Sequence, residues 1–226
     1  MERLPYRGRP VREEEAGDVS PDQLERLQSL LREQYKMRPV WRRYFPRRHS
    51  PTQKQMRHMI DDQKGTEVLH GAKILYLDDG PQCHPEFVTR LILASRRRVE
   101  RIFYHGESLG EIVAYFRERL RRCPSPHLLI ADGNLEMLPS LEPADHVVHG
   151  YDVVGRLSGD LSRTGVPAIG FSSDATLRKE FRAAGADGFV RKTIPPIAAV
   201  EEVAALYRRA IESLHQRRDW EFIEQD

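Results

Sequence analysis

Hydrophobic residues follow two different rhythms along this chain. Between residues 20 and 65 they recur at every third or fourth position, which predicts short helices with one apolar stripe each. From residue 71 onward, short β-branched or apolar runs alternate with segments of helical periodicity. The apolar positions of the first region are Leu24, Leu27, Leu30 and Leu31, followed by Met56, Met59 and Ile60.

Two helix starts can be recognised in the first region. Ser20 can cap a helix that has proline next and Gln23 at the third helical position, which is the arrangement of a capping box. The same order of residue types recurs at Ser50 and Gln53, and Gly65 provides a stop. We therefore expect two short helices that flank a basic segment, arranged as a hairpin.

The second region reads as five successive strand–helix units. Such alternation predicts an α/β fold with a five-stranded parallel sheet and helices on both faces. The predicted strands are 74–77, 99–104, 127–132, 167–171 and 189–192, and the predicted helices are 85–97, 108–120, 151–161, 176–185 and 197–214. This pattern divides the chain into a flexible N-terminal segment (1–19), a basic helical arm (20–70) and an α/β domain that includes the C-terminal helix (71–226).

The amino-acid composition bears on the partners and the cellular location of the protein. Hydrophobic residues make up 39% of the 226 residues, and 36 Lys and Arg nearly balance 34 Asp and Glu, so the global charge indicates no partner. Two cysteines, Cys83 and Cys123, are too few for a disulfide scaffold and lack the spacing of a zinc site. With no apolar signal-peptide core and no membrane span in the sequence, we expect a cytoplasmic protein without a membrane partner.

Polar residues stand at the carboxyl ends of the predicted strands, where parallel sheets usually carry their functional residues. Asp78 and Asp79 end the first strand and Asp132 ends the third. Ser172 ends the fourth strand and Lys192 ends the fifth. In a doubly wound sheet of order 2-1-3-4-5, the first and third strands are neighbours, and the crevice at their carboxyl ends is the usual ligand site.

Three neighbouring carboxylates repel one another unless a cation neutralises them, and Mg²⁺ prefers such hard oxygen ligands. Asp132 could then attack phosphorus and form an aspartyl phosphate. Lys192 and Ser172 could stabilise the charge on the transferred phosphoryl group. Each residue alone is weak evidence, since aspartate is common in turns. Their combination predicts a magnesium-assisted phosphoryl-transfer site.

The stretches ILYLDD, LLIAD, VPAIGFSS and AAGADGFVRK make residues 72–214 similar to the receiver domain of two-component response regulators, the flavodoxin-like fold of the chemotaxis protein CheY. The resemblance implies that the chain is a signalling protein and not an enzyme with its own substrate. It also implies a histidine kinase or a histidine phosphotransfer protein as phosphoryl donor, docking near the first helix of the domain.

The resemblance assigns a role to each matching position. The roles are Asp78 and Asp79 as metal-binding acids, Asp132 as phosphoryl acceptor and metal ligand, Asn134 as a metal ligand through its carbonyl, Ser172 and Phe189 as the switch pair, and Lys192 as the phosphate contact. Phosphorylation would draw Ser172 toward the phosphate and turn Phe189 inward, which would change the surface from the fourth to the fifth helix of the domain. Asn134 and Asp174 could position water for dephosphorylation.

The sequence departs from the receiver pattern in its loops. Thr193 follows Lys192 where the family usually has proline, and the stretch between Asp132 and the fourth strand is longer than usual. These changes leave the acids in place but alter the loops that sense phosphorylation. A receiver-fold scaffold that does not switch therefore stays open as an alternative, as does a hydrolase with an aspartate nucleophile.

The N-terminal arm is the second candidate for function. Residues 1–70 carry 15 basic and 11 acidic side chains, and the stretch 34–60 has eight basic residues and no acidic one. Aromatic residues lie among them, so the arm could bind nucleic acid through phosphates and bases, or could pack on the domain with solvated arginines. A protein target or a second copy of the chain are further partners for it. The candidate nucleic-acid-binding residues are Lys36, Arg38, Trp41, Arg42, Arg43, Arg47 and Arg48.

Overall fold

The structure is a computed structural model. It describes residues 19–36, 52–63, 65–78, 84–97, 99–103, 108–121, 126–135 and 148–223. Asp79, the first 18 residues and the candidate nucleic-acid-binding residues from Arg38 to Arg48, including Trp41, lie outside this part of the chain. Lys36 is described by its backbone alone. The expectations for these residues therefore stay predictions.

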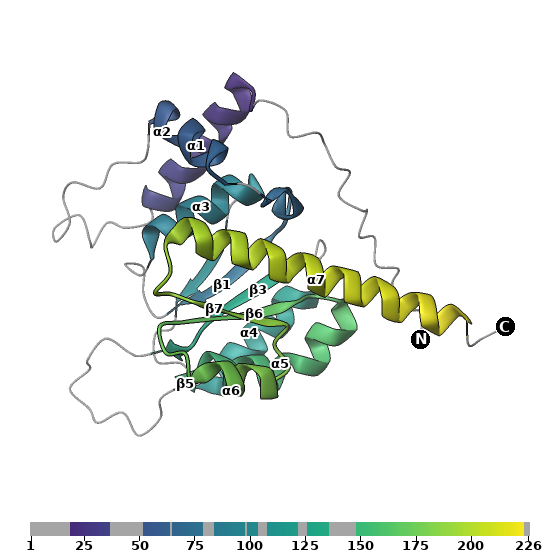
Figure 1. The fold of residues 1–226 in the computed structure, drawn as a ribbon. Coiled ribbons are helices and arrows are strands. Elements are labelled where there is room, and N and C mark those ends of the chain that lie inside the picture. Colours follow the sequence, from purple (N-terminus) through teal and green to yellow (C-terminus); the bar gives the residue numbers. More distant parts are fainter. Residues whose placement is uncertain are drawn as a thin grey trace, which may run out of the picture.

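Five parallel strands form the central sheet, in the order β2-β1-β3-β6-β7 (Figure 1). The order corresponds to 2-1-3-4-5 for the five strand–helix units, so the predicted fold class is confirmed. Each strand lies within one or two residues of its predicted place. The strands are β1 (Ile74–Asp78), β2 (Glu100–Phe103), β3 (Leu128–Asp132), β6 (Ala168–Ser172) and β7 (Gly188–Arg191).

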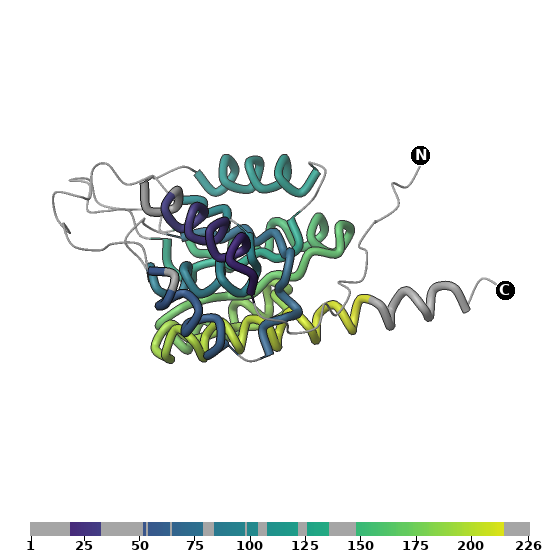
Figure 2. The backbone as a smooth tube through the Cα atoms, turned by 90° about the horizontal axis from the view of Figure 1, so that it is seen from above, coloured from purple at the N-terminus to yellow at the C-terminus, as the bar shows by residue number. Residues whose placement is uncertain are grey.

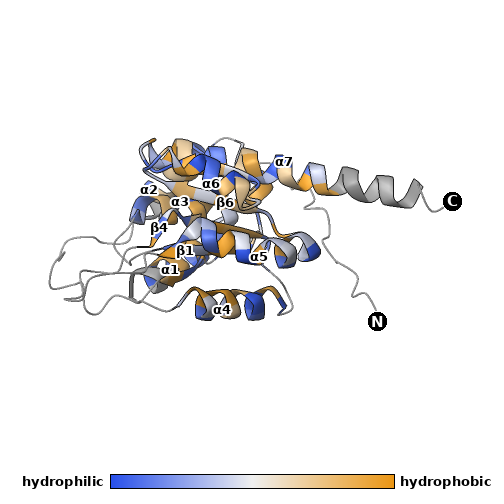
Figure 3. Ribbon diagram, turned by 90° about the horizontal axis from the view of Figure 1, so that it is seen from below, coloured by the Kyte–Doolittle hydropathy of each residue, from blue (hydrophilic) through white to orange (hydrophobic). Residues whose placement is uncertain are grey.

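Helices cover both faces of this sheet. Helices α3 (Pro85–Ser95) and α7 (Pro196–Ile223) pack together on one face. Helices α4 (Leu109–Arg121), α5 (Gly150–Thr164) and α6 (Leu177–Ala183) lie on the other. Figure 2 shows the yellow α7 and the teal α4 on opposite sides of the molecule. Along α4, hydrophobic and hydrophilic stretches alternate in Figure 3, as expected for a helix with one buried stripe.

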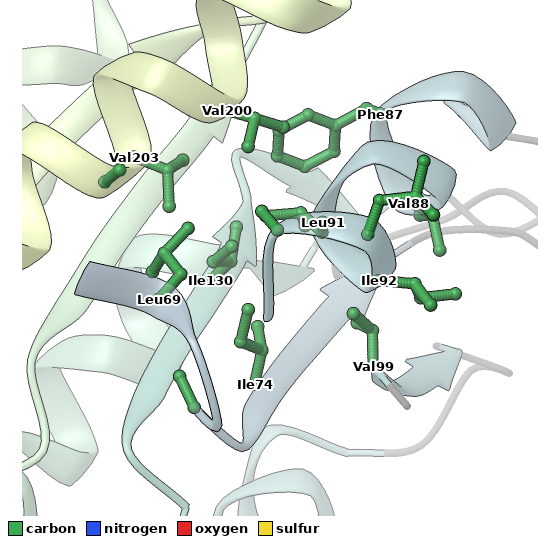
Figure 4. Close-up of a cluster of buried hydrophobic side chains, with 14 of the residues drawn as sticks. Leu69, Ile74, Phe87, Val88, Leu91, Ile92, Val99, Ile130, Val200 and Val203 are labelled. Atoms are coloured by element: carbon green, nitrogen blue, oxygen red, sulfur yellow. The ribbon is translucent and has the colours of Figure 1, made fainter. Parts of the chain in front are cut away.

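Alternate residues of each strand supply the two hydrophobic clusters. Ile74 and Ile130 lie on the α3–α7 face, in the same hydrophobic cluster as Phe87, Leu91 and Val200 (Figure 4). The intervening strand positions contribute to the cluster on the α4–α5 face. Because both faces of the sheet are covered, the strands read as continuous apolar runs, which is why the sequence pattern located them well.

The N-terminal helices pack on the same side as α3. Helices α1 (Pro21–Lys36) and α2 (Gln53–Asp61) contact each other and α3. Their fully buried residues Leu24, Leu31 and Met56 belong to the hydrophobic cluster that α3 and α7 share. A short 3₁₀ helix, η2 (Glu67–Leu69), leads from this pair into β1 and also contacts α7.

Three local features differ from the sequence prediction. Helix α2 is capped by Thr52 with Gln55 as its capping-box partner, so the expectation that Ser50 and Gln53 do this was wrong. Helix α7 continues to Ile223, beyond the expected end at residue 214. In the long stretch after Asp132, β4 (Asn134–Leu135) and β5 (Val148–His149) form a small antiparallel pair that the sequence did not indicate.

Among the described helices, none is both long enough and apolar enough to cross a lipid bilayer.

Candidate functional site

Two aspartates meet at the carboxyl edge of the sheet. Asp78 is the last residue of β1 and Asp132 the last residue of β3, and the residues just before them, Leu77 and Ala131, are paired in register. Both aspartates are almost completely buried. The predicted convergence of the first and third strands is therefore present for these two acids.

Lys192 is paired with Asp132. Its ammonium forms an ion pair with the Asp132 carboxylate and lies 5.6 Å from the centre of the Phe171 ring. The backbone N–H of Lys192 donates to the carbonyl oxygen of Ser172 at 2.9 Å, which ties the residue to the end of the neighbouring strand β6. A buried carboxylate needs such a partner to stay ionised. The lysine at the end of the fifth strand thus contacts the aspartate at the end of the third strand, as predicted.

The Ser172 hydroxyl lies against Gly133, the residue after Asp132. A Cβ atom placed on Gly133 would come within 2.5 Å of Ser172 Oγ, so only glycine leaves room for the hydroxyl there. The backbone N–H of Asp174 donates to Ser172 Oγ at 3.2 Å. Ser172 is therefore buried next to the acidic edge, which is the carboxyl edge of the sheet where Asp78 and Asp132 lie.

Asp174 makes local hydrogen bonds at the start of the turn after β6. Its Oδ1 accepts hydrogen bonds from the backbone N–H and the hydroxyl of Thr176, at 2.8 and 2.7 Å. These bonds hold the pKa of Asp174 below its usual range. The carboxylate thus stabilises the turn that leads into α6.

Asn134 is held next to Asp132 by two contacts. Its backbone N–H donates to Asp132 Oδ1 at 3.3 Å, and its side-chain Oδ1 lies 3.2 Å from Nδ1 of His149. The His149 ring stacks on Tyr151 at 4.8 Å between centroids. His149 is a site residue that sequence reasoning missed. Only the unpredicted β4–β5 pair brings it to Asn134.

Phe189 is already buried. Only 7% of its surface is exposed, its ring lies 5.8 Å from the Phe181 ring, and the Arg178 guanidinium lies 5.7 Å from its centre. The sequence-based hypothesis had this aromatic turning inward after phosphorylation. In this structure the side chain already lies inside the hydrophobic cluster on the α4–α5 face.

Arg101 is the second site residue that sequence reasoning missed. It lies in the middle of β2, and its guanidinium forms an ion pair with the Asp78 carboxylate. The sequence treated this stretch as an ordinary strand. The available signal was a lone arginine two residues from the end of a strand that lies next to the acidic one.

The surroundings of Asp78 act on its ionisation in opposite directions. The pKa of Asp78 is raised to about 7, mainly by burial, and the neighbouring Asp132 carboxylate acts in the same direction. The Arg101 guanidinium opposes this rise through its charge and its hydrogen bond. Arg101, and to a smaller extent the charge of Lys192, therefore favours the ionised form of this carboxylate.

The site contains ligands of the type that Mg²⁺ binds. Two buried carboxylates lie at neighbouring strand ends, and carboxylate oxygens are the ligands that this ion prefers. Within the described residues there is no group of three His, Cys, Asp or Glu side chains placed to hold a metal. Asp79, the expected third acid, lies outside that part of the chain. Asp78 and Asp132 are thus ligands of the kind that this ion binds, and each of the two has a basic partner.

No family model and no curated protein matches the sequence. Solved structures do resemble it, and those described here are response regulators or receiver domains. A putative response regulator from Chloroflexus aurantiacus is 20% identical over 61% of this chain and 98% of its own, with a TM-score of 0.43. The chemotaxis response regulator CheY4 of Vibrio cholerae is 19% identical, covering 60% and 98% of the two chains, with a TM-score of 0.42.

A third similar structure is the receiver domain of the histidine kinase CKI1 from Arabidopsis thaliana, complexed with Mg²⁺. It is 20% identical over 60% of this chain and 92% of its own, with a TM-score of 0.43. At such identities and TM-scores the likeness carries no conclusion about this chain. The strand order of the sheet, seen directly in this chain, is what establishes the doubly wound architecture.

Proposed function

We propose that this chain is a response-regulator receiver protein that accepts a phosphoryl group on Asp132. The observation that carries the proposal is the ion pair between Asp132 and Lys192 at the carboxyl edge of the sheet, next to the buried Asp78. A buried nucleophilic carboxylate with its own ammonium partner is the pairing that phosphoryl transfer to a carboxylate needs.

The chemistry assigns one task to each side chain. A carboxylate oxygen of Asp132 forms a bond to phosphorus while the bond from phosphorus to the donor's histidine nitrogen breaks, and the imidazole leaves with that electron pair. The Lys192 ammonium and the Ser172 hydroxyl contact the phosphoryl oxygens. Mg²⁺, held by Asp78, Asp79, Asp132 and the Asn134 carbonyl, would supply further positive charge.

The readout of phosphorylation would lie at the ends of β6 and β7. Ser172 follows the new phosphoryl group, and the Lys192 backbone is bonded to Ser172, so a shift of one moves the other. This would change the surface formed by α6, β7 and the start of α7. The phosphoryl donor would be a histidine kinase or a phosphotransfer protein. The target of the changed surface would be a protein, a nucleic acid or a second copy of the chain.

Incubation with acetyl phosphate and Mg²⁺ tests the proposal directly. Intact-mass spectrometry is expected to show the addition of one phosphoryl group, lost in the Asp132→Asn variant and reduced in Lys192→Ala. Glu212→Gln, on the exposed side of α7, serves as a control that labels like the wild type. A folded wild-type protein that gains no Asp132-dependent mass would refute phosphoacceptance.

A second candidate is a receiver-fold scaffold that does not switch. Two observations favour it: Phe189 is already inside the core, and Asp78 already has a basic partner. Labelling of Asp132 without any change in association state or partner binding would support the scaffold. Labelling accompanied by such a change would support the switching receiver.

A further inference from the structure

Arg101 reaches the acidic edge from the neighbouring strand. In the sheet it is paired in register with Tyr76, two residues before Asp78, so its side chain lies on the same face as Asp78 and leans toward the carboxyl end. The Arg101 side chain is 2% exposed and the Asp78 side chain is not exposed at all. The pair is therefore shielded from solvent and from screening by salt.

Aromatic rings hold the guanidinium in place. Its central carbon lies 4.7 Å from the centre of the Phe103 ring and 5.8 Å from that of Tyr76. Cation–π contacts of this kind are worth more when the cation is desolvated. These contacts restrict the Arg101 side chain to one conformation, whereas a solvated arginine side chain would adopt many conformations.

Both described acids of the site have a basic partner. Asp78 is paired with Arg101 and Asp132 with Lys192. A divalent ion that binds the Asp78 carboxylate must displace this guanidinium or approach it closely. Either costs free energy, because a buried charge-assisted hydrogen bond is lost or two positive charges meet in a poorly screened site.

We propose that Arg101 is an internal competitor for the divalent ion: its guanidinium occupies the Asp78 carboxylate in the metal-free protein and must leave it when a metal binds. Divalent-ion affinity is therefore set by Arg101, and ion binding is coupled to movement of this side chain. The inference concerns the metal site of the proposed receiver and in that respect rests on the proposed function.

Binding of Mn²⁺, measured by electron paramagnetic resonance of the free ion, provides the first test. Arg101→Gln removes the competing charge and is expected to bind Mn²⁺ roughly tenfold more tightly than the wild type, since one charge-assisted hydrogen bond no longer opposes the ion. Arg101→Lys keeps the charge and should stay within a few-fold of the wild type. Arg117→Gln, which removes an arginine paired with Asp160 outside the site, is the matched control and should change nothing.

A folded Arg101→Gln protein with unchanged or weaker Mn²⁺ affinity would overturn the proposal. If that variant does not fold, the full-length wild type decides the matter by nuclear magnetic resonance. The side-chain Nε–H signal of Arg101, assigned by its absence in Arg101→Lys, is expected to shift on Mg²⁺ addition while that of Arg117 does not. An unmoved Arg101 signal at a Mg²⁺ concentration that shifts the Asp132 amide would equally refute it.

Labelling with acetyl phosphate separates this inference from the proposed function. If wild-type Asp132 is labelled but the Arg101 variants bind Mn²⁺ like the wild type, only the role of Arg101 fails. If Arg101→Gln binds Mn²⁺ more tightly but Asp132 is never labelled, phosphoacceptance fails and the competition between Arg101 and the metal stands.

Discussion

The glycine at the start of α5 fixes the backbone beside Asp132. A Cβ atom on Gly150 would lie 1.8 Å from the carbonyl oxygen of Asp132, and its N–H donates to the Gly133 carbonyl oxygen at 3.1 Å. We expect Gly150→Ala to lower the free energy of unfolding by about 3 kcal/mol, because the backbone must move to relieve the clash. Urea unfolding measures this loss, and acetyl phosphate labelling of Asp132 should fall with it.

Gly159 in the same helix is the matched control. Nothing lies within 4 Å of a Cβ placed there, so Gly159→Ala should leave labelling unchanged and raise stability by up to about 1 kcal/mol through helix propensity. Equal effects of the two alanines would show that the close approach to Asp132 has no consequence.

His127 makes stability depend on pH at the opposite edge of the sheet. Its Nδ1 accepts a hydrogen bond from the Lys73 backbone N–H at 3.0 Å, which requires the neutral ring. Burial lowers the pKa of His127 below its usual 6.5, and the charges of Arg97 and Lys73 act in the same direction. The contribution of the neutral ring to stability is therefore complete above pH 6.5 and is lost as pH falls through the lowered pKa.

Urea unfolding of the wild type and His127→Asn between pH 8 and 5 tests this expectation. Asparagine offers an acceptor oxygen that does not titrate, so the wild type should lose stability relative to the variant as the solution becomes acidic. Parallel curves for the two proteins would contradict the assignment.

Residues at strand ends could be predicted because the sheet fixes where they go. Asp132, Ser172 and Lys192 each follow an apolar run, and parallel strands bring such positions to one edge. Arg101 and His149 could not be predicted in this way. The first acts across a strand pair, which requires knowing the register, and the second depends on a hairpin of two-residue strands with no periodic signal.

At the scale of elements, the α1–α2 pair belongs to the same hydrophobic cluster as α3 and α7. Leu31 in α1 is completely buried. Its replacement by alanine is expected to cost about 2–4 kcal/mol of unfolding free energy, because it leaves a cavity in the shared core. Ser29→Ala, at an exposed position of the same helix, should change stability by less than about 0.5 kcal/mol.

Unfolding followed by circular dichroism and by hydrogen exchange of the β1 amides distinguishes two cases. If the helices and the sheet form one cooperative unit, Leu31→Ala shifts both transitions together. A variant in which only α1 and α2 lose protection, with the β1 amides unaffected, would show that the pair unfolds independently of the domain.

Helix boundaries were predictable where a capping residue decided them. Ser20 accepts from the Gln23 N–H at 3.2 Å and its own N–H donates to Gln23 Oε1, as the sequence indicated. The second helix had two acceptable caps within three residues, Ser50 and Thr52, and local chemistry alone could not choose between them. The end of α7 is not marked by a capping residue in the sequence pattern, so the predicted end at residue 214 came too early.

At the scale of the whole molecule, the arm and the acidic edge are linked through α3. The α1–α2 pair contacts α3, and Phe87 of α3 stacks on Phe171 at 4.2 Å between ring centres. Phe171 in turn lies under the Lys192 ammonium. A phosphoryl donor that docks near α3, as the resemblance implies, would therefore approach next to the arm.

Hydrogen exchange of the whole protein tests which parts respond to phosphorylation. With Asp132 labelled, we expect slower exchange at Gly133 and from Ser172 to Asp174, because the phosphoryl group adds contacts there, and a change at Lys192 through its bond to Ser172. Phe189 should change little, since its side chain is already buried. The Asp132→Asn protein under the same conditions is the control. Full labelling with unchanged exchange at all these positions would mean that phosphorylation is not transmitted beyond Asp132, and the scaffold would then be the better account of this protein.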